Sequence, residues 1–197
     1  MKIFLLVIAG LTVTFLSFQL YTSMATETQS YKIIRTGKDF EIRFYPRATL
    51  ATITTLATNY NALGNSGFKK LAGYIFGGNS GKQKIAMTSP VHMHVNDSSS
   101  TMSFVMPAEF TKDSLPVPND STVSIETTAD EYVAAIRFGG FATEKRIREY
   151  TTKLENALKA NAIPYHGFFR LLAYNPPYQL FGRRNEIIVR TEQNLKD

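Results

Sequence analysis

The stretch from residue 61 to residue 78, NALGNSGFKKLAGYIFGG, decides the fold class of this chain. Its apolar residues recur at the spacing of one face of an α-helix, and they are Leu63, Gly67, Phe68, Leu71 and Ile75. Gly77 and Gly78 close the segment, as glycine commonly does at a helix C-terminus. The stretch therefore predicts a helix over residues 61–76 with one apolar face.

Short runs typical of β-strands lie on both sides of this helix. The predicted strands of this half are residues 31–34, 40–45, 48–56, 85–87, 91–95 and 101–106. Within FEIRFY at 40–45, apolar and polar side chains alternate, which indicates a strand buried on one face. A proline-rich segment over 107–120 follows and is predicted to be a surface loop.

The second half of the chain has the order strand, strand, helix, strand, strand, and so again places strands on both sides of one helix. Its predicted strands are residues 123–127, 132–138, 168–174 and 186–190. Thr143 is a suitable N-cap for the second helix, with Glu144 in its first turn. The apolar stripe of this helix is Ile147, Tyr150, Leu154, Ala157 and Leu158. The pattern predicts an α+β fold, with two helices packed against a mixed or antiparallel, curled sheet.

Composition restricts the chemistry open to the protein. Its 197 residues are 44% hydrophobic and include 24 aromatic side chains (14 Phe and 10 Tyr), enough to bury a core in one domain. The chain has no Cys, which excludes thiolate metal sites and cysteine nucleophiles. Its net charge of +6 favours anionic ligands in general without selecting one.

The first 25 residues are predicted to be a signal peptide or a membrane anchor. Lys2 precedes an apolar run over residues 3–20, and Ser23-Met24-Ala25 offers small residues at the positions that precede a cleavage site. The run lies at the lower length limit for a membrane-spanning helix. Under both interpretations, residues 26–197 lie outside the cytoplasm. They are in the periplasm or extracellular space if the segment is cleaved, and otherwise they are associated with the membrane through residues 3–20.

Few residues suggest catalysis or metal binding. His92 and His94 share one face of a predicted strand and are candidate metal or iron ligands, or else part of a solvated strand face. Arg183 and Arg184 could hold a carboxylate or a phosphate, or could form a turn into the last strand with Glu186 as a local partner. No nucleophile, acid and base occur in a recognisable motif. No other metal site is predicted.

Five strings, in order along the chain, point to a known family. They are FEIRFY at 40–45, FKKLAGYIFGGN at 68–79, KIAMTSPV at 84–91, FGGF at 138–141, and YNPP at 174–177 followed by GRRNEI at 182–187. Through these strings the chain resembles the SOUL haem-binding protein family from Tyr31 to Thr191. The resemblance implies that residues 26–197 form one SOUL-like haem-binding domain. It also implies a distorted β-barrel built from two strand–helix–strand halves.

The resemblance further implies non-catalytic binding of haem or another tetrapyrrole in an apolar groove beside the first helix. The implied haem-binding residues are Leu63, Phe68, Lys69, Lys70, Leu71 and Ile75, with Lys70 near the propionates. Some family members have a histidine in the opening strand as an axial iron ligand, whereas this chain has Phe44 there. His92 and His94 are then the candidate iron ligands, and without them apolar contact and propionate pairing alone would hold the haem.

Three functions therefore stay open at this point. The first is a tetrapyrrole carrier or buffer outside the cytoplasm. The second is a binding module for another small amphipathic ligand. The third is a hydrolase acting on a small hydrophobic substrate, which would need a buried and unpaired carboxylate such as Glu41 or Glu186. Nucleic-acid binding is not expected, because the positive charges are scattered along the chain.

Overall fold

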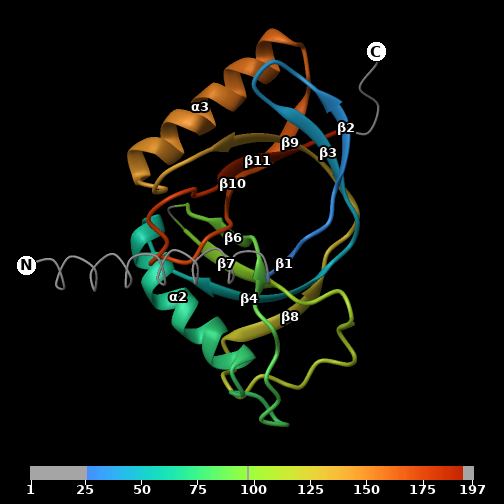
Figure 1. The fold of residues 1–197 in the computed structure, drawn as a ribbon, viewed down its shortest axis with the longest axis vertical. Coiled ribbons are helices and arrows are strands. Elements are labelled where there is room, and N and C mark those ends of the chain that lie inside the picture. Colours follow the sequence, from blue (N-terminus) through green and yellow to red (C-terminus); the bar gives the residue numbers. More distant parts are fainter. Residues whose placement is uncertain (1–25, 97, 193–197) are drawn as a thin grey trace, which may run out of the picture.

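A computed structural model describes residues 26–96 and 98–192 of the chain. Within these residues it contains two helices, α2 (Tyr60–Ile75) and α3 (Glu144–Ala160), and a nine-stranded sheet (Figure 1). The strands of the sheet are β2 (Lys32–Thr36), β3 (Glu41–Tyr45), β4 (Thr49–Thr55), β6 (Val91–His94), β7 (Ser100–Val105), β8 (Val123–Thr127), β9 (Glu131–Phe138), β10 (Tyr165–Ala173) and β11 (Asn185–Thr191). Two further strands, β1 (Glu27–Thr28) and β5 (Thr88–Ser89), pair in parallel. The predicted α+β class is confirmed.

The two halves of the chain exchange strands within the sheet. Its order is β2-β3-β9-β11-β10-β6-β7-β4-β8, with every neighbouring pair antiparallel. Strand β3 of the first half pairs with β9 of the second, and β8 of the second half pairs with β4 of the first. The pairing of β6 with β10 joins the halves at the centre. Neither half can therefore complete its sheet alone.

The sheet has two separate edges, so the predicted closure into a barrel is not confirmed. Strand β2 forms one edge and β8 the other, and the two lie apart at opposite ends of the molecule (Figure 1). All five residues of β2 are exposed, and its pairing with β3 shifts register between Ile33 and Arg35. Exposed charges and such an irregularity are features that keep an edge strand from pairing further.

Both helices cover the same face of the sheet. Helix α2 packs on β4 and β7, and α3 packs on β9 and β11. One apolar core contains residues of both helices, including Leu63 and Leu154, together with Ala134 and Ile136 of β9. The alternating residues of the strands form a second cluster on the opposite face, which is called the helix-free face here. That cluster consists of Tyr45, Val133, Ala135, Leu172 and Ile188, with Tyr31 and Tyr174 packed against it.

An N-terminal strap, residues 27–31, crosses the helix-free face. Its first residues form β1, and the Gln29 amide donates to the Ser89 carbonyl oxygen at 2.7 Å. The Gln29 side chain contacts His92, and the ring of Tyr31 lies 5.2 Å from that of Tyr45. The strap therefore covers part of the second cluster.

Polar side chains fix the starts of both helices. Asn59 caps α2 by accepting from the Ala62 amide, and Thr143 caps α3 by accepting from the Arg146 amide. The predicted N-cap at Thr143 is thereby confirmed. Glu144 Oε1 also accepts a hydrogen bond from the Tyr60 amide at 2.7 Å, which holds the first turns of the two helices together.

The predicted strand at residues 85–87 is wrong. The Ile85 amide donates to the Ile75 carbonyl oxygen at 2.8 Å, so this segment satisfies a carbonyl that the end of α2 leaves without a helical partner. Ile85 is buried in the core beneath the helix end. Strand pairing begins only at Thr88, in β5.

Residues 1–25, which carry the predicted signal peptide or membrane anchor, lie outside the described residues. In the part of the chain that the structure describes, no helix combines the length and apolar character needed to cross a bilayer.

Replacing Leu71 by alanine tests the packing of α2. The side chain is fully buried against the sheet, so we expect Leu71→Ala to lower the free energy of unfolding by about 2–5 kcal/mol. Urea denaturation measures this change. The neighbouring exposed Lys69→Ala is the matched control, expected to stay within about 0.5 kcal/mol of the unsubstituted protein. Equal effects of the two substitutions would show that the apolar stripe does not face the core.

Candidate functional site

The haem-binding residues predicted on α2 divide between the core and the surface. Leu63 and Leu71 have no exposed area and Ile75 has 1%, so all three pack against the sheet and not into an open groove. Phe68 is half-buried and meets the ring of Phe104 edge-on at 5.3 Å. Half of the predicted set therefore lies in the core on which α2 rests.

The two lysines of the predicted set are exposed on α2. Lys70 Nζ donates to Thr122 Oγ1 at 2.9 Å and lies 3.9 Å from Asp120 Oδ2. The charge of Lys70 thus already has a polar neighbourhood at the start of β8. Phe44, at the position where the family resemblance implies an axial histidine in some members, pairs its ring with Tyr132 at 5.1 Å.

His92 and His94 lie on the helix-free face, where they line a cavity of about 200 Å³. Their side chains are only 7% and 8% exposed, so the expectation of a solvated strand face was wrong. The strap residue Gln29 and the ring of Phe168 cover them. Alternation correctly placed both histidines on one face, but their cover comes from segments distant in the sequence.

Hydrogen bonds orient both buried imidazoles. His92 Nε2 lies 2.8 Å from Gln29 Oε1, and because a carboxamide oxygen only accepts, the proton is on Nε2. His94 Nδ1 donates to the Phe169 carbonyl oxygen at 3.2 Å, and Asn96 Nδ2 donates to His94 Nε2 at 3.3 Å. Burial, together with the nearby Arg170 charge, lowers the pKa of His92 to about 3. Burial also lowers the pKa of His94.

Iron ligation through either nitrogen of His94, or through Nε2 of His92, would require a hydrogen bond to break. Both nitrogens of His94 and Nε2 of His92 already have partners within the protein. Within residues 26–96 and 98–192, no group of three or more His, Asp or Glu residues is arranged to hold a metal ion.

An ion cluster and a bulge shape the same cavity. Glu131 accepts from Arg170 through both carboxylate oxygens at 2.8 Å, and from Arg190 Nε at 2.8 Å. Burial by itself would raise the pKa of Glu131, but the two guanidinium groups hold it below its ordinary value. A register shift in β10 between His166 and Arg170 turns Phe168 out over His94, with the rings 3.7 Å apart.

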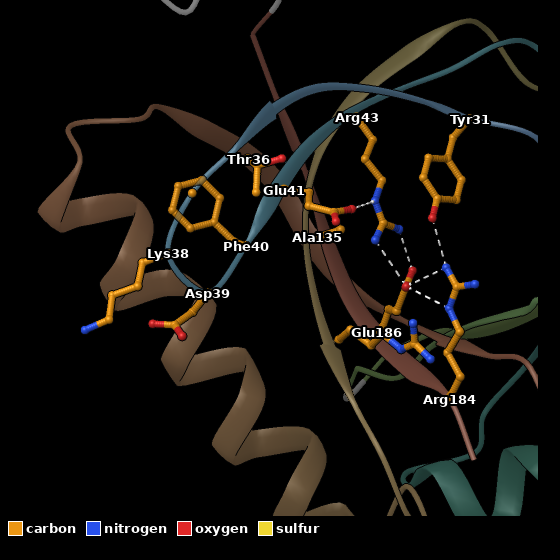
Figure 2. A pocket seen from close by; sticks show the side chains of 12 residues that line it. Tyr31, Thr36, Lys38, Asp39, Phe40, Glu41, Arg43, Ala135, Arg184 and Glu186 are labelled. Atoms are coloured by element: carbon orange, nitrogen blue, oxygen red, sulfur yellow. Dashed lines mark hydrogen bonds and ion pairs between the residues drawn. The ribbon is translucent and has the colours of Figure 1, made fainter. Parts of the chain in front are cut away.

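A second cavity on the helix-free face, of about 280 Å³, lies beside the turn between β2 and β3 (Figure 2). Its floor contains a buried ion pair in which Arg43 Nη1 donates to Glu186 Oε2 at 2.6 Å, and Arg43 Nη2 donates to Oε1 at 3.2 Å. Arg43 Nε also donates to Glu41 at 2.7 Å. This pair joins β3 to β11 across 143 residues of sequence.

Glu186 has no exposed area, and donors surround its carboxylate. Besides Arg43, Arg184 donates to Oε1 through Nε and Nη2 at 3.0 and 2.8 Å, and the Tyr174 hydroxyl donates to Oε2 at 2.9 Å. Burial by itself would raise the pKa of Glu186, but Arg43 and Arg184 together hold it below its ordinary value. Burial would likewise lower the pKa of Arg43, and its pairing with Glu186 raises it instead.

This arrangement does not provide a general acid or base. Glu186 is buried, as the hydrolase interpretation required, but it is fully paired. The expected local pairing of Arg184 with Glu186 is present. Arg43 was not identified from the sequence, since in FEIRFY it occupies an alternating polar position that resembles the solvent side of a strand.

A third feature is a cation beside exposed aromatic rings, where the loops 139–143 and 175–184 meet. Arg183 Nη1 donates to the carbonyl oxygens of Pro176 and Gln179 at 2.8 and 2.7 Å, and the guanidinium lies 4.6 Å from the Phe141 ring centre. Its Nε is buried without a hydrogen-bond partner among the described residues, and burial lowers the pKa of Arg183.

The same two loops expose large apolar side chains. These are Phe141, Tyr178, Leu180 and Phe181, of which Phe181 is 72% exposed. The aromatic–arginine surface is defined as these four residues together with Arg183. Phe141 of this surface precedes Glu144, which bonds to the Tyr60 amide at the start of α2. The GRRNEI and FGGF strings mark its two loops in the sequence, but only Arg183 was singled out there.

A family model described as SOUL heme-binding protein matches residues 26–190. "Heme-binding protein 2" of Mus musculus is 32% identical over 156 residues, which cover 75% of this chain and 76% of the relative. "Heme-binding protein 1" of Xenopus laevis is 29% identical over 159 residues, covering 77% of this chain and 83% of the relative.

Solved structures share the fold at low sequence identity. The EcmrR C-terminal domain is 10% identical with a TM-score of 0.60, and the match covers 83% of this chain and 99% of that domain. A hydrolase from Listeria innocua is 10% identical with a TM-score of 0.55, covering 81% and 94%. At such identities the likeness extends to the fold alone.

Replacing Glu186 by glutamine tests the buried ion pair. Because Arg43 would lose its main counter-charge inside the protein, we expect Glu186→Gln to cost about 3–5 kcal/mol of unfolding free energy at pH 7. The depressed pKa of Glu186 means that its stabilisation is present at neutral pH and is lost as the pH falls below the ordinary value of a glutamate. Urea denaturation between pH 7 and 3 measures both effects.

The control for Glu186→Gln is Glu149→Gln, at an exposed carboxylate paired with Lys153 on α3. Surface pairs of this kind contribute little, so the control variant should unfold like the unsubstituted protein. A Glu186→Gln variant as stable as the control would contradict the structural role given to the pair.

Because of His92, the free energy of unfolding should already decrease between pH 7 and 5, a range above that in which carboxylates titrate. Its pKa is about 3 in the folded protein and about 6.5 when unfolded, so its contribution is present at neutral pH and declines as the pH drops through 6.5 towards 3. Between pH 7 and 5 this group should cost about 2 kcal/mol. Urea denaturation at the two pH values should show a smaller loss in His92→Gln. The exposed His166→Gln is the control and should keep the full loss.

Proposed function

The chain belongs to the SOUL heme-binding protein family, and we propose that it binds haem or a related tetrapyrrole without converting it chemically. The observation that carries the proposal is the match of the SOUL family model over residues 26–190. The relatives named as heme-binding proteins, over three quarters of the chain, support the same ligand.

The chemistry of the aromatic–arginine surface supports a tetrapyrrole ligand, and we propose this surface as part of the haem groove. A tetrapyrrole offers a flat apolar face and anionic propionates. The surface offers exposed rings beside a guanidinium that is hydrogen-bonded to backbone carbonyls. Arg183 Nε, buried without a partner, indicates a cation whose donors are incompletely used. The residues of the aromatic–arginine surface therefore fit a tetrapyrrole.

Within this proposal the predicted residues of α2 have different roles. Leu63, Leu71 and Ile75 support the helix from the core, while Lys69 and Lys70 offer charge on its exposed side. Haem is held by apolar contact and propionate pairing, and not by a histidine from β6. The absence of a histidine at Phe44 points the same way.

The alternative functions receive less support. A different small amphipathic ligand would use the same surface, so it is distinguished only by a binding measurement. Hydrolysis would need an unpaired carboxylate, and Glu186 is paired with two arginines. A carrier or buffer role outside the cytoplasm is part of the proposal and rests on the export signal predicted in residues 1–25.

A hemin titration followed by Soret absorbance tests the function. We expect a saturable one-to-one shift in the unsubstituted protein. Arg183→Gln should weaken binding about ten-fold, the effect of losing one charge-assisted hydrogen bond. Arg148→Gln, at an exposed position on α3, removes the same charge elsewhere and should bind as before. Only the broad spectrum of aggregated hemin would refute haem binding and favour another amphipathic ligand.

The variant with both His92→Gln and His94→Gln separates apolar binding from iron ligation. Since the β6 histidines have partners within the protein, we expect the Soret maximum of this variant to stay unchanged. A shifted maximum, with melting unchanged, would instead assign an axial ligand to β6.

A further inference from the structure

The cavity beside the β2–β3 turn offers a binding site separate from the aromatic–arginine surface. Strap residue Tyr31 and the turn at 36–39 form its sides, and Ala135 of β9 and Glu186 of β11 lie deeper (Figure 2). Its volume of about 280 Å³ is below the usual range for drug-sized ligands, and equals that of about nine waters. The cavity is therefore suited to a small organic molecule.

The charges around this cavity leave one positive charge in excess. Its cationic lining residues are Lys38, Arg43, Arg137 and Arg184, and its anionic ones are Asp39, Glu41 and Glu186. Four cations against three anions give +1. A monoanion would neutralise the site, whereas a cation would add to the excess.

The buried carboxylate cannot attract a cation, because its lone pairs are already used. Glu186 accepts hydrogen bonds from Arg43, Arg184 and Tyr174 on its two oxygens. In Figure 2 the guanidinium groups of Arg43 and Arg184 approach this carboxylate from two different directions. The pair is thus an internally satisfied floor, and a ligand must bind to the donors around it.

Arg137 supplies such a donor. It lies on β9 directly opposite Glu186 in the register of β9 and β11, and it lines the cavity. Among residues 26–96 and 98–192 its guanidinium forms no hydrogen bond or ion pair. Arg184 lines the cavity beside it and uses Nε and Nη2 for Glu186, which leaves Nη1 as a second donor. A guanidinium fork matches a carboxylate through two parallel hydrogen bonds.

Apolar walls next to these donors specify the rest of the ligand. Ala135 and the edge of Phe40 line the cavity together with the Tyr31 ring, whose one face is covered by Arg43 at 4.2 Å. Inorganic phosphate carries more charge than the site has in excess and would leave these walls unused. We propose that this cavity binds a small organic monocarboxylate, with the carboxylate on Arg137 and the apolar body against Tyr31, Phe40 and Ala135.

Benzoate, its cationic near-isostere benzamidine, and inorganic phosphate are the probes for this proposal. Each is titrated into the ¹⁵N-labelled protein, and amide chemical shifts are followed by NMR. We expect benzoate to give saturable shifts confined to residues 36–41, 135–137 and 184–186. Benzamidine should give none, and phosphate should bind more weakly than benzoate. Equal or tighter binding of benzamidine or phosphate would overturn the proposal, as would benzoate shifts that do not saturate.

Two substitutions at exposed cavity positions test the assignment of Arg137. Arg137→Gln should weaken benzoate about ten-fold, because it removes a charge-assisted bidentate partner. Asp39→Asn, which raises the excess to +2, should tighten benzoate. Arg148→Gln on α3 is the matched control and should change nothing. If Arg137→Gln binds benzoate as the control does, Arg137 does not hold the carboxylate and the proposal fails.

The carboxylate site does not depend on the proposed haem binding. Failure of the carboxylate proposal can therefore be told apart from failure of the haem proposal. Arg137 lines the cavity and does not belong to the aromatic–arginine surface, and Arg183 is not among the residues that line the cavity. Arg137→Gln should therefore leave the hemin titration unchanged, and Arg183→Gln should leave the benzoate titration unchanged.

Discussion

The buried pairing of Arg43 with Glu186 is the interaction on which the two halves of this protein depend. It joins β3, from the beginning of the chain, to β11, near its end, at the place where the halves exchange strands. Two charges taken out of water are tolerated only when their hydrogen bonds are satisfied. Tyr174, Arg184 and Glu41 complete that requirement, so residues from β3, β11 and the loop between β10 and β11 must come together. The pair therefore specifies the register of the fold more than it adds stability.

The division of the sheet into two faces organises everything else. Both helices and the larger core take one face, which places the apolar stripe of α2 against strands and leaves only its far side to ligands. The helix-free face carries a smaller apolar cluster between two charged cavities, and the strap covers it from Gln29 to Tyr31. Buried charge is concentrated there because each cation has a carboxylate within reach.

The two proposed binding sites differ in the kind of ligand that they suit. The proposed haem surface is made by loops at the start of the helices, where rings are exposed and Arg183 has only carbonyl partners. A broad apolar ligand with anionic groups suits it. The cavity near Arg137 is small and walled by charge, and it suits a small anion. The two proposed sites of this protein therefore differ in the chemistry of the ligand that each would take.

Local sequence patterns were enough to predict both helices, the α+β class, Thr143 as a cap, the shared face of His92 and His94, and the family. These follow from local periodicity, capping chemistry and short strings, which require no knowledge of distant segments. The packing partners of each face, in contrast, became known only from the tertiary structure. The stripe of α2 met strands and not a ligand, the histidines were covered by Gln29 and Phe168, and the polar side of FEIRFY became the buried site of Arg43. The sheet is open because its two edge strands, β2 and β8, do not pair with each other. Periodicity tells which residues share a face, but the partner of that face depends on pairing between segments more than a hundred residues apart, such as Arg43 and Glu186.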